Sequence, residues 1–264
     1  MEEDVFSQYQ ISDKWKLLDN IKDRSKCSIC NKSRKYFCYT CYVPVSCVLN
    51  IIPEVTLPIQ IDIIKHKREI DGKSTSVHAA LLAPKDVAIL QYPDDLSSLS
   101  YNNRTILIYP GKNPCSLTKY FELQPIYTSS VKEQKETTEY GAILISGQVL
   151  KLPFDKAVFV DGTWNQSKAM YGCLKNLPCI VLKSRTSQFW RHQKNSPRWY
   201  LATIEAIHQL IDEIYQYCYT ITNTSQTKLR DHDNLLFFFR YMYHIIHSFY
   251  DHNSLLSYRR PLNL

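Results

Sequence analysis

Four cysteines near the start of the chain have the spacing of a metal site. Cys27 and Cys30 form one Cys-x-x-Cys pair, and Cys38 and Cys41 form a second pair after seven intervening residues. Each two-residue gap lets both thiolates of a tight turn face one tetrahedral ion, so the two turns supply four ligands. We therefore expect a compact four-cysteine zinc knuckle with a structural role, because four protein ligands leave no position for a substrate water. The alternative is a group of buried thiols that holds no metal.

An acidic residue ends one of the apolar runs. Residues 157–160 are apolar, and Asp161 follows directly, ahead of Gly162, Thr163 and Trp164. An acid at the carboxyl end of a parallel strand lies where open α/β sheets bind their ligands. A tryptophan ring offers a flat face for stacking on a base or an adenine. The alternative is that Asp161 caps a helix beginning near residue 165 and that Trp164 lies in the core.

Residues 183–200 combine cations with aromatic rings and contain no acid. Cations neutralise phosphates while aromatic side chains stack on unpaired bases, which is how single-stranded RNA is usually held. A solvated loop anchored by its aromatic residues would explain the rings but not the exclusion of acids. We therefore expect an RNA contact made by Lys183, Arg185, Arg191, His192, Lys194 and Arg198.

The elements that must position these residues alternate between strand and helix patterns. Short runs rich in Val and Ile, bounded by Pro, Gly or Asp, are typical of strands buried on both faces. With helical patterns at about 201–218 and 234–250, they predict an α/β fold with a mostly parallel sheet flanked by helices. The expected strands are 59–64, 87–91, 105–109, 157–160 and 179–182.

The chain divides into three parts in this interpretation. Residues 1–26 form a polar lead-in, residues 27–50 the zinc knuckle, and residues 51–264 the main domain. Within that domain, residues 126–150 are polar and aperiodic, so we expect a variable insertion or a mobile loop there.

Composition excludes several classes of protein. With 44% hydrophobic and 22% charged residues, the chain is typical of globular rather than disordered proteins. No apolar run approaches the roughly 20 residues of a membrane helix, so we expect no membrane partner. The opening residues are acidic, unlike a secretory or transit signal. We therefore expect reduced cysteines in the cytosol or nucleus, and the net charge of +7 indicates a polyanionic partner.

Together these motifs resemble those of the DTW-domain family, the tRNA-uridine aminocarboxypropyltransferases. Residues 161–164 are similar to its Asp-x-Thr-Trp signature, and His66 with Ser74-Thr75 resembles an upstream family pattern. Two positions depart from the family: Lys67 stands where proline is common, and Ala202 where serine is often found. Over roughly residues 25–250, the chain is most similar to the type-one eukaryotic members, in the segments 38–45, 71–84, 189–194 and 203–206.

The resemblance implies a SPOUT-like, knotted α/β domain at residues 51–264 that binds S-adenosylmethionine in loops at the knot. One of Arg185, Arg191 and Arg198 is then expected to bind the carboxylate of this co-substrate. The other expected contacts come from Thr75, Pro110, Gly111, Thr163, Leu182 and Thr203.

The implied reaction moves the 3-amino-3-carboxypropyl group to N3 of a tRNA uridine, in the D-loop, with methylthioadenosine leaving. Uridine N3 holds its proton at neutral pH, a carboxylate within hydrogen-bond reach can remove it during attack, and Asp161 is the candidate base. Trp164 is expected to stack on the base or shape the pocket. The implied partner is tRNA, no obligate protein partner is inferred, and the implied location is the nucleus, with the cytoplasm as the alternative.

Two other functions stay open on the sequence alone. One is a SPOUT-type RNA methyltransferase, which would use the same cofactor but transfer its methyl group. The other is a non-catalytic zinc-knuckle protein that binds RNA, in which Asp161 only caps a helix.

Overall fold

A computed structural model describes residues 4–95, 101–130, 140–193, 196–224 and 230–261. Its centre is a six-stranded sheet in the order β6-β5-β12-β7-β13-β8, and all of its pairings are parallel. The five expected strands are confirmed, and the sheet also includes a short edge strand, β8. The strands are β5 (Gln60–His66), β6 (Val87–Tyr92), β7 (Thr105–Ile108), β8 (Cys115–Ser116), β12 (Lys156–Asp161) and β13 (Cys179–Val181).

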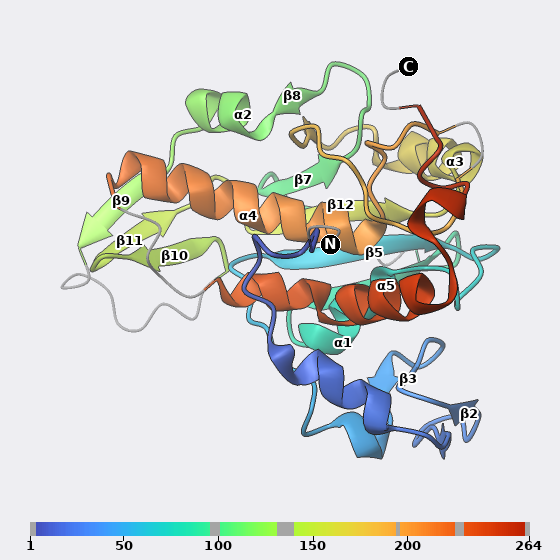
Figure 1. The fold of residues 1–264 in the computed structure, drawn as a ribbon. Helices are drawn as coiled ribbons and strands as arrows, with labels where there is room; N and C mark the ends of the chain where they lie inside the picture. Colours follow the sequence, from blue (N-terminus) through green and yellow to red (C-terminus); the bar gives the residue numbers. More distant parts are fainter. Residues whose placement is uncertain (1–3, 96–100, 131–139, 194–195, 225–229, 262–264) are drawn as a thin grey trace.

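Side chains of the central strands alternate between the two faces of the sheet. On β5, Ile61 and Ile63 belong to the larger core cluster, whereas Ile64 belongs to a smaller one on the other face. In Figure 1, helices α4 (Thr203–Ile221) and α5 (Phe237–Phe249) cross the front of the sheet, over the larger cluster. The smaller cluster packs beneath α3. The helices are α1 (Ser76–Leu82), α2 (Leu117–Leu123), α3 (Trp164–Leu174), α4 (Thr203–Ile221) and α5 (Phe237–Phe249), with 3-10 turns η5 (Asp231–Leu236) and η6 (His252–Ser254).

The two helical patterns near the end of the chain are confirmed as α4 and α5. On α4, the apolar stripe that runs from Ile204 to Cys218 is buried. Helix α1 is absent from the sequence prediction because all seven of its residues are buried, which leaves no polar face to reveal a helical period.

The expectation of an aperiodic loop at 126–150 is wrong where the structure describes this region. Strands β9 (Tyr127–Ser130), β10 (Ala142–Ile145) and β11 (Gln148–Lys151) form an antiparallel sheet in the order β10-β11-β9. Ile143 and Ile145 on one strand and Val149 and Leu150 on the next are buried against the domain. Residues 131–139 lie outside the described residues, and an insertion relative to other family members stays a prediction.

The N-terminal residues pack onto the main core. Phe6, Ile11, Trp15 and Leu18 are buried there, the last two on a 3-10 helix, η1 (Asp13–Asn20). The cysteine region follows as two small hairpins and a 3-10 turn. These are β1 (Ser25–Lys26) with β2 (Ser33–Arg34), β3 (Phe37–Cys38) with β4 (Val43–Pro44), and η2 (Ser46–Val48).

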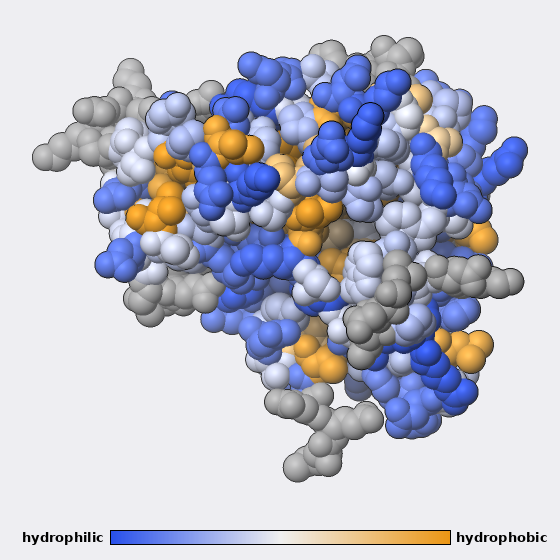
Figure 2. All heavy atoms as spheres, turned by 90° about the horizontal axis from the view of Figure 1, so that it is seen from above, coloured by the Kyte–Doolittle hydropathy of each residue, from blue (hydrophilic) through white to orange (hydrophobic). Residues whose placement is uncertain are grey.

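Across the described ranges, no helix combines the length and apolar character needed to cross a bilayer. Figure 2 shows one face of the molecule, which is largely hydrophilic and carries several separate hydrophobic areas.

Candidate functional site

The carboxyl ends of the parallel strands surround a cavity of about 460 Å³. This is the edge at which open α/β sheets bind ligands, and the volume lies within the range of small-molecule sites. Four segments supply most of the wall: the loop after β5, the end of β12, the loop after β13 and the turn into α4. The polar and aromatic lining residues include Glu69, Lys73, Ser74, Thr75, Tyr109, Asp161, Trp164, Lys183, Trp199, Tyr200 and Thr203.

Asp161 lies at the last position of β12, with its carboxylate held at this cavity. The residue is 5% exposed, and each carboxylate oxygen accepts a hydrogen bond. Ser74 donates to Oδ2 at 2.6 Å and Thr203 donates to Oδ1 at 2.6 Å. Both hydroxyls come from segments far away in the sequence, so the fold fixes the orientation of the carboxylate.

The helix after Asp161 is capped by another residue. Thr163 is the N-cap of α3: its side chain accepts from the backbone N–H of Gln166, whose side chain accepts from the backbone N–H of Thr163. The interpretation of Asp161 as a helix cap is therefore wrong.

Aromatic rings form one wall of the cavity. The ring centroids of Trp164 and Tyr200 are 4.1 Å apart, and the ring of Trp199 stands perpendicular to that of Tyr200 at 4.4 Å. Trp164 is half-buried and lines the cavity, so it does not lie in the core. Such faces suit stacking on a purine or a uracil ring.

A buried cation lies beside Asp161. Lys65 is 2% exposed and is the register partner of Asp161 on β5. Burial favours its neutral form, but a hydrogen bond with Asp71 and the charges of Tyr42, Asp71 and Asp161 raise its pKa above the ordinary value. Glu69, on the cavity wall, has its pKa raised by burial and by the charge of Asp161. Lys65 therefore stays protonated near the carboxyl groups of Asp161 and Glu69.

The loop after β5 also completes the start of α4. Ala202, the N-cap residue, has no side-chain oxygen to offer, but Thr75 Oγ1 accepts a hydrogen bond from the backbone N–H of Ile204 at 3.2 Å. The Glu205 side chain accepts from the backbone N–H of Ala202 at 2.8 Å. Thr75 therefore takes the place of the hydroxyl missing at position 202, and Glu205 binds the N–H of the N-cap residue, so the helix start that presents Thr203 keeps both hydrogen bonds.

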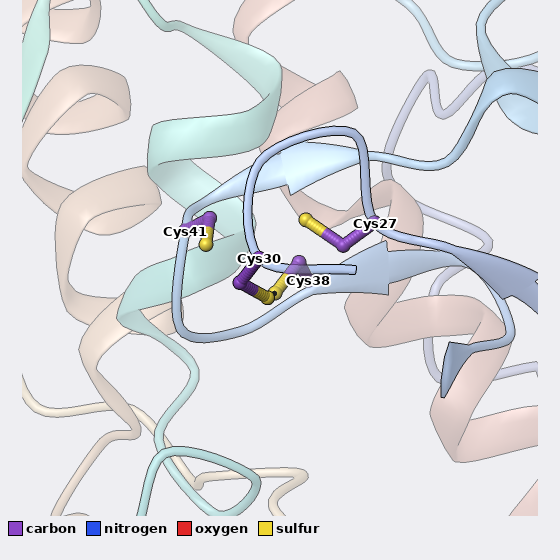
Figure 3. A group of neighbouring side chains, drawn as sticks. All are labelled: Cys27, Cys30, Cys38 and Cys41. Atoms are coloured by element: carbon purple, nitrogen blue, oxygen red, sulfur yellow. Dashed lines mark hydrogen bonds between the residues drawn. The ribbon is translucent and has the colours of Figure 1, made fainter. Parts of the chain in front are cut away.

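The four cysteines converge as the spacing predicts. Figure 3 shows the side chains of Cys27, Cys30, Cys38 and Cys41 gathered between two turns, and their sulfur atoms all lie within 4.8 Å of one another. The turns share one geometry: the residue after each pair, Asn31 and Tyr42, has a φ of +56°. In both turns that residue's N–H donates to the carbonyl of the first cysteine of the pair.

The electrostatics of this cluster suit a cation. Burial opposes ionisation of Cys38, but hydrogen bonds from Arg34 and from the backbone of Cys41 and Thr40 lower its pKa to about 6. Burial and the neighbouring thiols raise the pKa of Cys41. Four thiols at these distances cannot all ionise without a positive partner, and a tetrahedral metal ion with four sulfur ligands supplies one. The donor set therefore fits zinc.

A second group of potential metal ligands contains a carboxylate that already forms hydrogen bonds within the protein. His208, His232 and Asp233 lie close together and are buried. Arg230 donates to Asp233 at 2.9 Å, and the Asp233 carboxylate also accepts from the backbone N–H of Gln10. This network ties the N-terminal segment to the body of the protein.

Comparison with known proteins identifies the family of this chain. The model of the DTW domain matches residues 35–247. The chain belongs to the DTW-domain family. It is 39% identical over 263 residues to tRNA-uridine aminocarboxypropyltransferase 1 of Xenopus laevis, covering 93% of this chain and 88% of the relative. It is 38% identical over 244 residues to the human protein of the same name, covering 84% and 77%. No solved structure matches the chain.

Within the DTW domain, four of the six expected cofactor residues line the cavity: Thr75, Pro110, Leu182 and Thr203. Gly111 and Thr163 are not among the lining residues. A Cβ on Gly111 would lie 2.7 Å from Cys179 Sγ and from the Tyr171 ring, so this glycine permits close packing.

The structure places the expected RNA-contacting cations in different surroundings. Lys183 lines the cavity and His192 is exposed, but Arg185 donates to Tyr9 and to the carbonyl of Glu205. The Arg198 guanidinium lies 5.2 Å from the centre of the Tyr258 ring. Arg191 donates to the carbonyl of Gly72. Lys194 lies outside the described residues.

The cations on the cavity wall are lysines. Lys73 and Lys183 are among its lining residues, whereas Arg185, Arg191 and Arg198 are not. Sequence reasoning missed Glu69 and Lys73, although both lie in the short segment between His66 and Ser74-Thr75. The charged residues of that segment are the signal that could have found them.

Proposed function

We propose that this chain transfers the 3-amino-3-carboxypropyl group of S-adenosylmethionine to N3 of a uridine in tRNA. The observation that carries the proposal is the Asp161 carboxylate, held by Ser74 and Thr203 at a cavity with an aromatic wall. The relatives with 37–39% identity are tRNA-uridine aminocarboxypropyltransferases, and the chain covers most of their length.

The residues of the cavity fit the parts of this reaction. When bound, S-adenosylmethionine supplies a carbon activated by its sulfonium and a neutral leaving group, methylthioadenosine. Asp161 takes the N3 proton as the new N–C bond forms and the C–S bond breaks, an effect typically worth ~10²–10⁴-fold. Trp164 and Tyr200 stack on a flat ring, which holds the reacting atoms in line.

The polar ends of the transferred group need partners of both charges. Lys73 and Lys183 line the cavity and suit the carboxylate, and Glu69 suits the ammonium group. These residues take the place of the arginine expected from the sequence. Apolar contacts from Pro110 and Leu182 suit the adenosine part.

The knuckle holds zinc in this proposal, with Cys27, Cys30, Cys38 and Cys41 as its four ligands. The convergence of the sulfur atoms and the matching turns support this assignment. The ion has a structural role, because no coordination position remains for substrate.

The main domain has the knotted SPOUT-like topology in this proposal. Later strands lie between earlier ones: β12 lies between β5 and β7, and β13 lies between β7 and β8. This strand order is compatible with a threaded chain. The proposed location is the nucleus and the proposed target is a D-loop uridine, both from the family resemblance.

Mass analysis of nucleosides from unmodified tRNA, incubated with the protein and S-adenosylmethionine, tests the function. We expect a uridine that carries the aminocarboxypropyl group and an equal amount of methylthioadenosine. S-adenosylhomocysteine with methylated RNA would instead identify a methyltransferase. Unchanged nucleosides, with tRNA bound, would identify a non-catalytic RNA-binding protein.

A further inference from the structure

The knuckle region carries a concentration of positive charge that the proposed reaction does not use. Residues 24–53 contain five cations and no acid. Of these, Arg34 is buried, Lys35 is half-buried, and three others are exposed: Arg24, Lys26 and Lys32. A polyanion is the partner that such a distribution favours.

The buried cation belongs to the cysteine cluster. Arg34 Nε lies 3.4 Å from Cys38 Sγ, and the guanidinium also contacts Tyr39 and Thr40. A zinc ion with four thiolates carries two negative charges, and Arg34 offsets part of them. Three other cations of this region, Lys26, Lys32 and Lys35, form no ion pair in the described part of the chain.

The knuckle contacts the loop that lines the cavity. Thr40 Oγ1 donates to Asp71 Oδ2 at 3.3 Å, and Lys65 Nζ lies 5.8 Å from the centre of the Tyr42 ring. Asp71 belongs to residues 67–75, the loop after β5, which supplies Ser74 and Thr75 to the cavity wall. This contact joins the knuckle to a loop that forms part of the cavity wall.

The loop after β5, which contacts the knuckle and lines the cavity, also carries exposed cations. Lys67, Arg68 and Lys73 are exposed, and Lys73 also lines the cavity. Asp71 does not cancel this charge, because it is paired with the buried Lys65. Exposed cations are therefore present both on the knuckle and on the loop that it contacts, and Glu69 is the acid of this loop that lines the cavity.

We infer that Lys26, Lys32 and Lys35 of the knuckle, with Lys67 and Arg68 of the loop, form a basic strip that binds the tRNA backbone. This inference rests on the proposed function, because a uridine must enter the cavity for its neighbouring phosphates to reach the strip. The strip recognises phosphates and not bases, since lysines act as point charges. The zinc knuckle thus has a second task, which is to hold three lysines beside the catalytic cavity.

A charge-matched pair of variants tests the strip. Lys26→Gln/Lys32→Gln removes two strip charges, and Lys119→Gln/Lys151→Gln removes two charges from α2 and β11, at the other end of the molecule (Figure 1). The measurement is the dissociation constant for unmodified tRNA as a function of salt, with zinc content and melting temperature as controls.

For the strip variant we expect roughly 3- to 30-fold weaker tRNA binding at physiological salt, because two phosphate contacts are lost. The slope of log K against log salt should fall by about 1.4–1.8, because each phosphate contact contributes about 0.7–0.9. At saturating tRNA, kcat should stay at the wild-type value, and the loss should lie in KM. The control variant should bind tRNA like the wild type.

Equal affinities and equal salt slopes for the two variants would overturn the inference. If Lys26→Gln/Lys32→Gln loses zinc, Lys67→Gln/Arg68→Gln decides, because these residues lie outside the cysteine turns. Strip-dependent tRNA binding by a wild-type protein that modifies no uridine would keep the strip and reject the proposed function. If the wild type modifies uridine and the strip variant binds tRNA as tightly as the wild type, the proposed function stands and the strip is rejected.

Discussion

The hydroxyl of Thr203 donates a 2.6 Å hydrogen bond to Oδ1 of Asp161, although 42 residues separate the two along the chain. Thr203 begins α4 and Asp161 ends β12, so the first turn of a helix fixes the side chain at the end of a strand. Ser74 holds the second oxygen from a third segment. In the proposed function Asp161 is the general base, and a base acts efficiently only when its lone pair meets the proton in one geometry. The two hydrogen bonds restrict the carboxylate to one orientation.

The first prediction concerns the base itself. Asp161→Asn keeps the shape of the side chain but cannot take up the N3 proton, so we expect kcat to fall by ~10²–10⁴-fold. Steady-state transfer to unmodified tRNA measures this effect, while zinc content and tRNA affinity should match the wild type. Wild-type kcat in this variant would remove Asp161 from the role of base.

The second prediction concerns the clamp on the base. Thr203→Val removes one hydrogen bond of about 1–1.5 kcal/mol, so kcat should fall roughly tenfold with little change in KM. Thr203→Ser keeps the hydroxyl and should restore most of the rate. If Val and Ser give the same rate, the hydroxyl does not position Asp161, and the methyl group accounts for any loss.

Cysteine substitutions separate the metal site from the other thiols. We expect Cys38→Ser to abolish zinc binding and lower the melting temperature, because the buried cluster then lacks one of four ligands. Cys47 is exposed and is not part of the cluster, so Cys47→Ser is the matched control and should keep one zinc per chain. Elemental analysis measures the zinc content, and thermal unfolding measures the melting temperature. Retention of zinc by Cys38→Ser would contradict the assignment.

Much of the central sheet can be predicted from the sequence, because strands buried on both faces are continuous apolar runs with clear ends. The small sheet formed by β9, β10 and β11 cannot, since its strands are four residues long, only part of β10 and of β11 is buried, and Tyr127 and Thr128 of β9 are exposed. Local spacing also predicts the cysteine cluster, because each pair lies in one turn.

Hydrogen bonds between residues far apart in the sequence are the part of the site that the sequence does not predict. Ser74 and Asp161 are 87 residues apart, and nothing in either segment indicates their hydrogen bond. Arg185 shows the same limit: its place in an acid-free stretch predicts an RNA contact and gives no sign of its protein partners. The fold brings Tyr9 and the carbonyl of Glu205 to its guanidinium.

The last prediction concerns the stability of the protein in mild acid. His78 is 4% exposed, and its ring packs against Phe37 and Phe238. Burial lowers its pKa from 6.5 to about 3 in the folded protein. Between these values the unfolded chain binds a proton that the folded chain does not, so the free energy of unfolding rises with pH. The contribution of His78 is therefore complete above about pH 6.5 and is lost as the pH falls.

Chemical denaturation at several pH values measures this contribution. Between pH 6.5 and pH 5, His78 alone should reduce the free energy of unfolding by about 2 kcal/mol. His78→Phe keeps an aromatic ring between Phe37 and Phe238 but removes the titrating group, so its free energy of unfolding should depend less on pH over this range. His208, whose pKa burial lowers to about 4, keeps the slope of the variant above zero. A variant with the full wild-type slope would mean that the buried ring of His78 does not resist protonation.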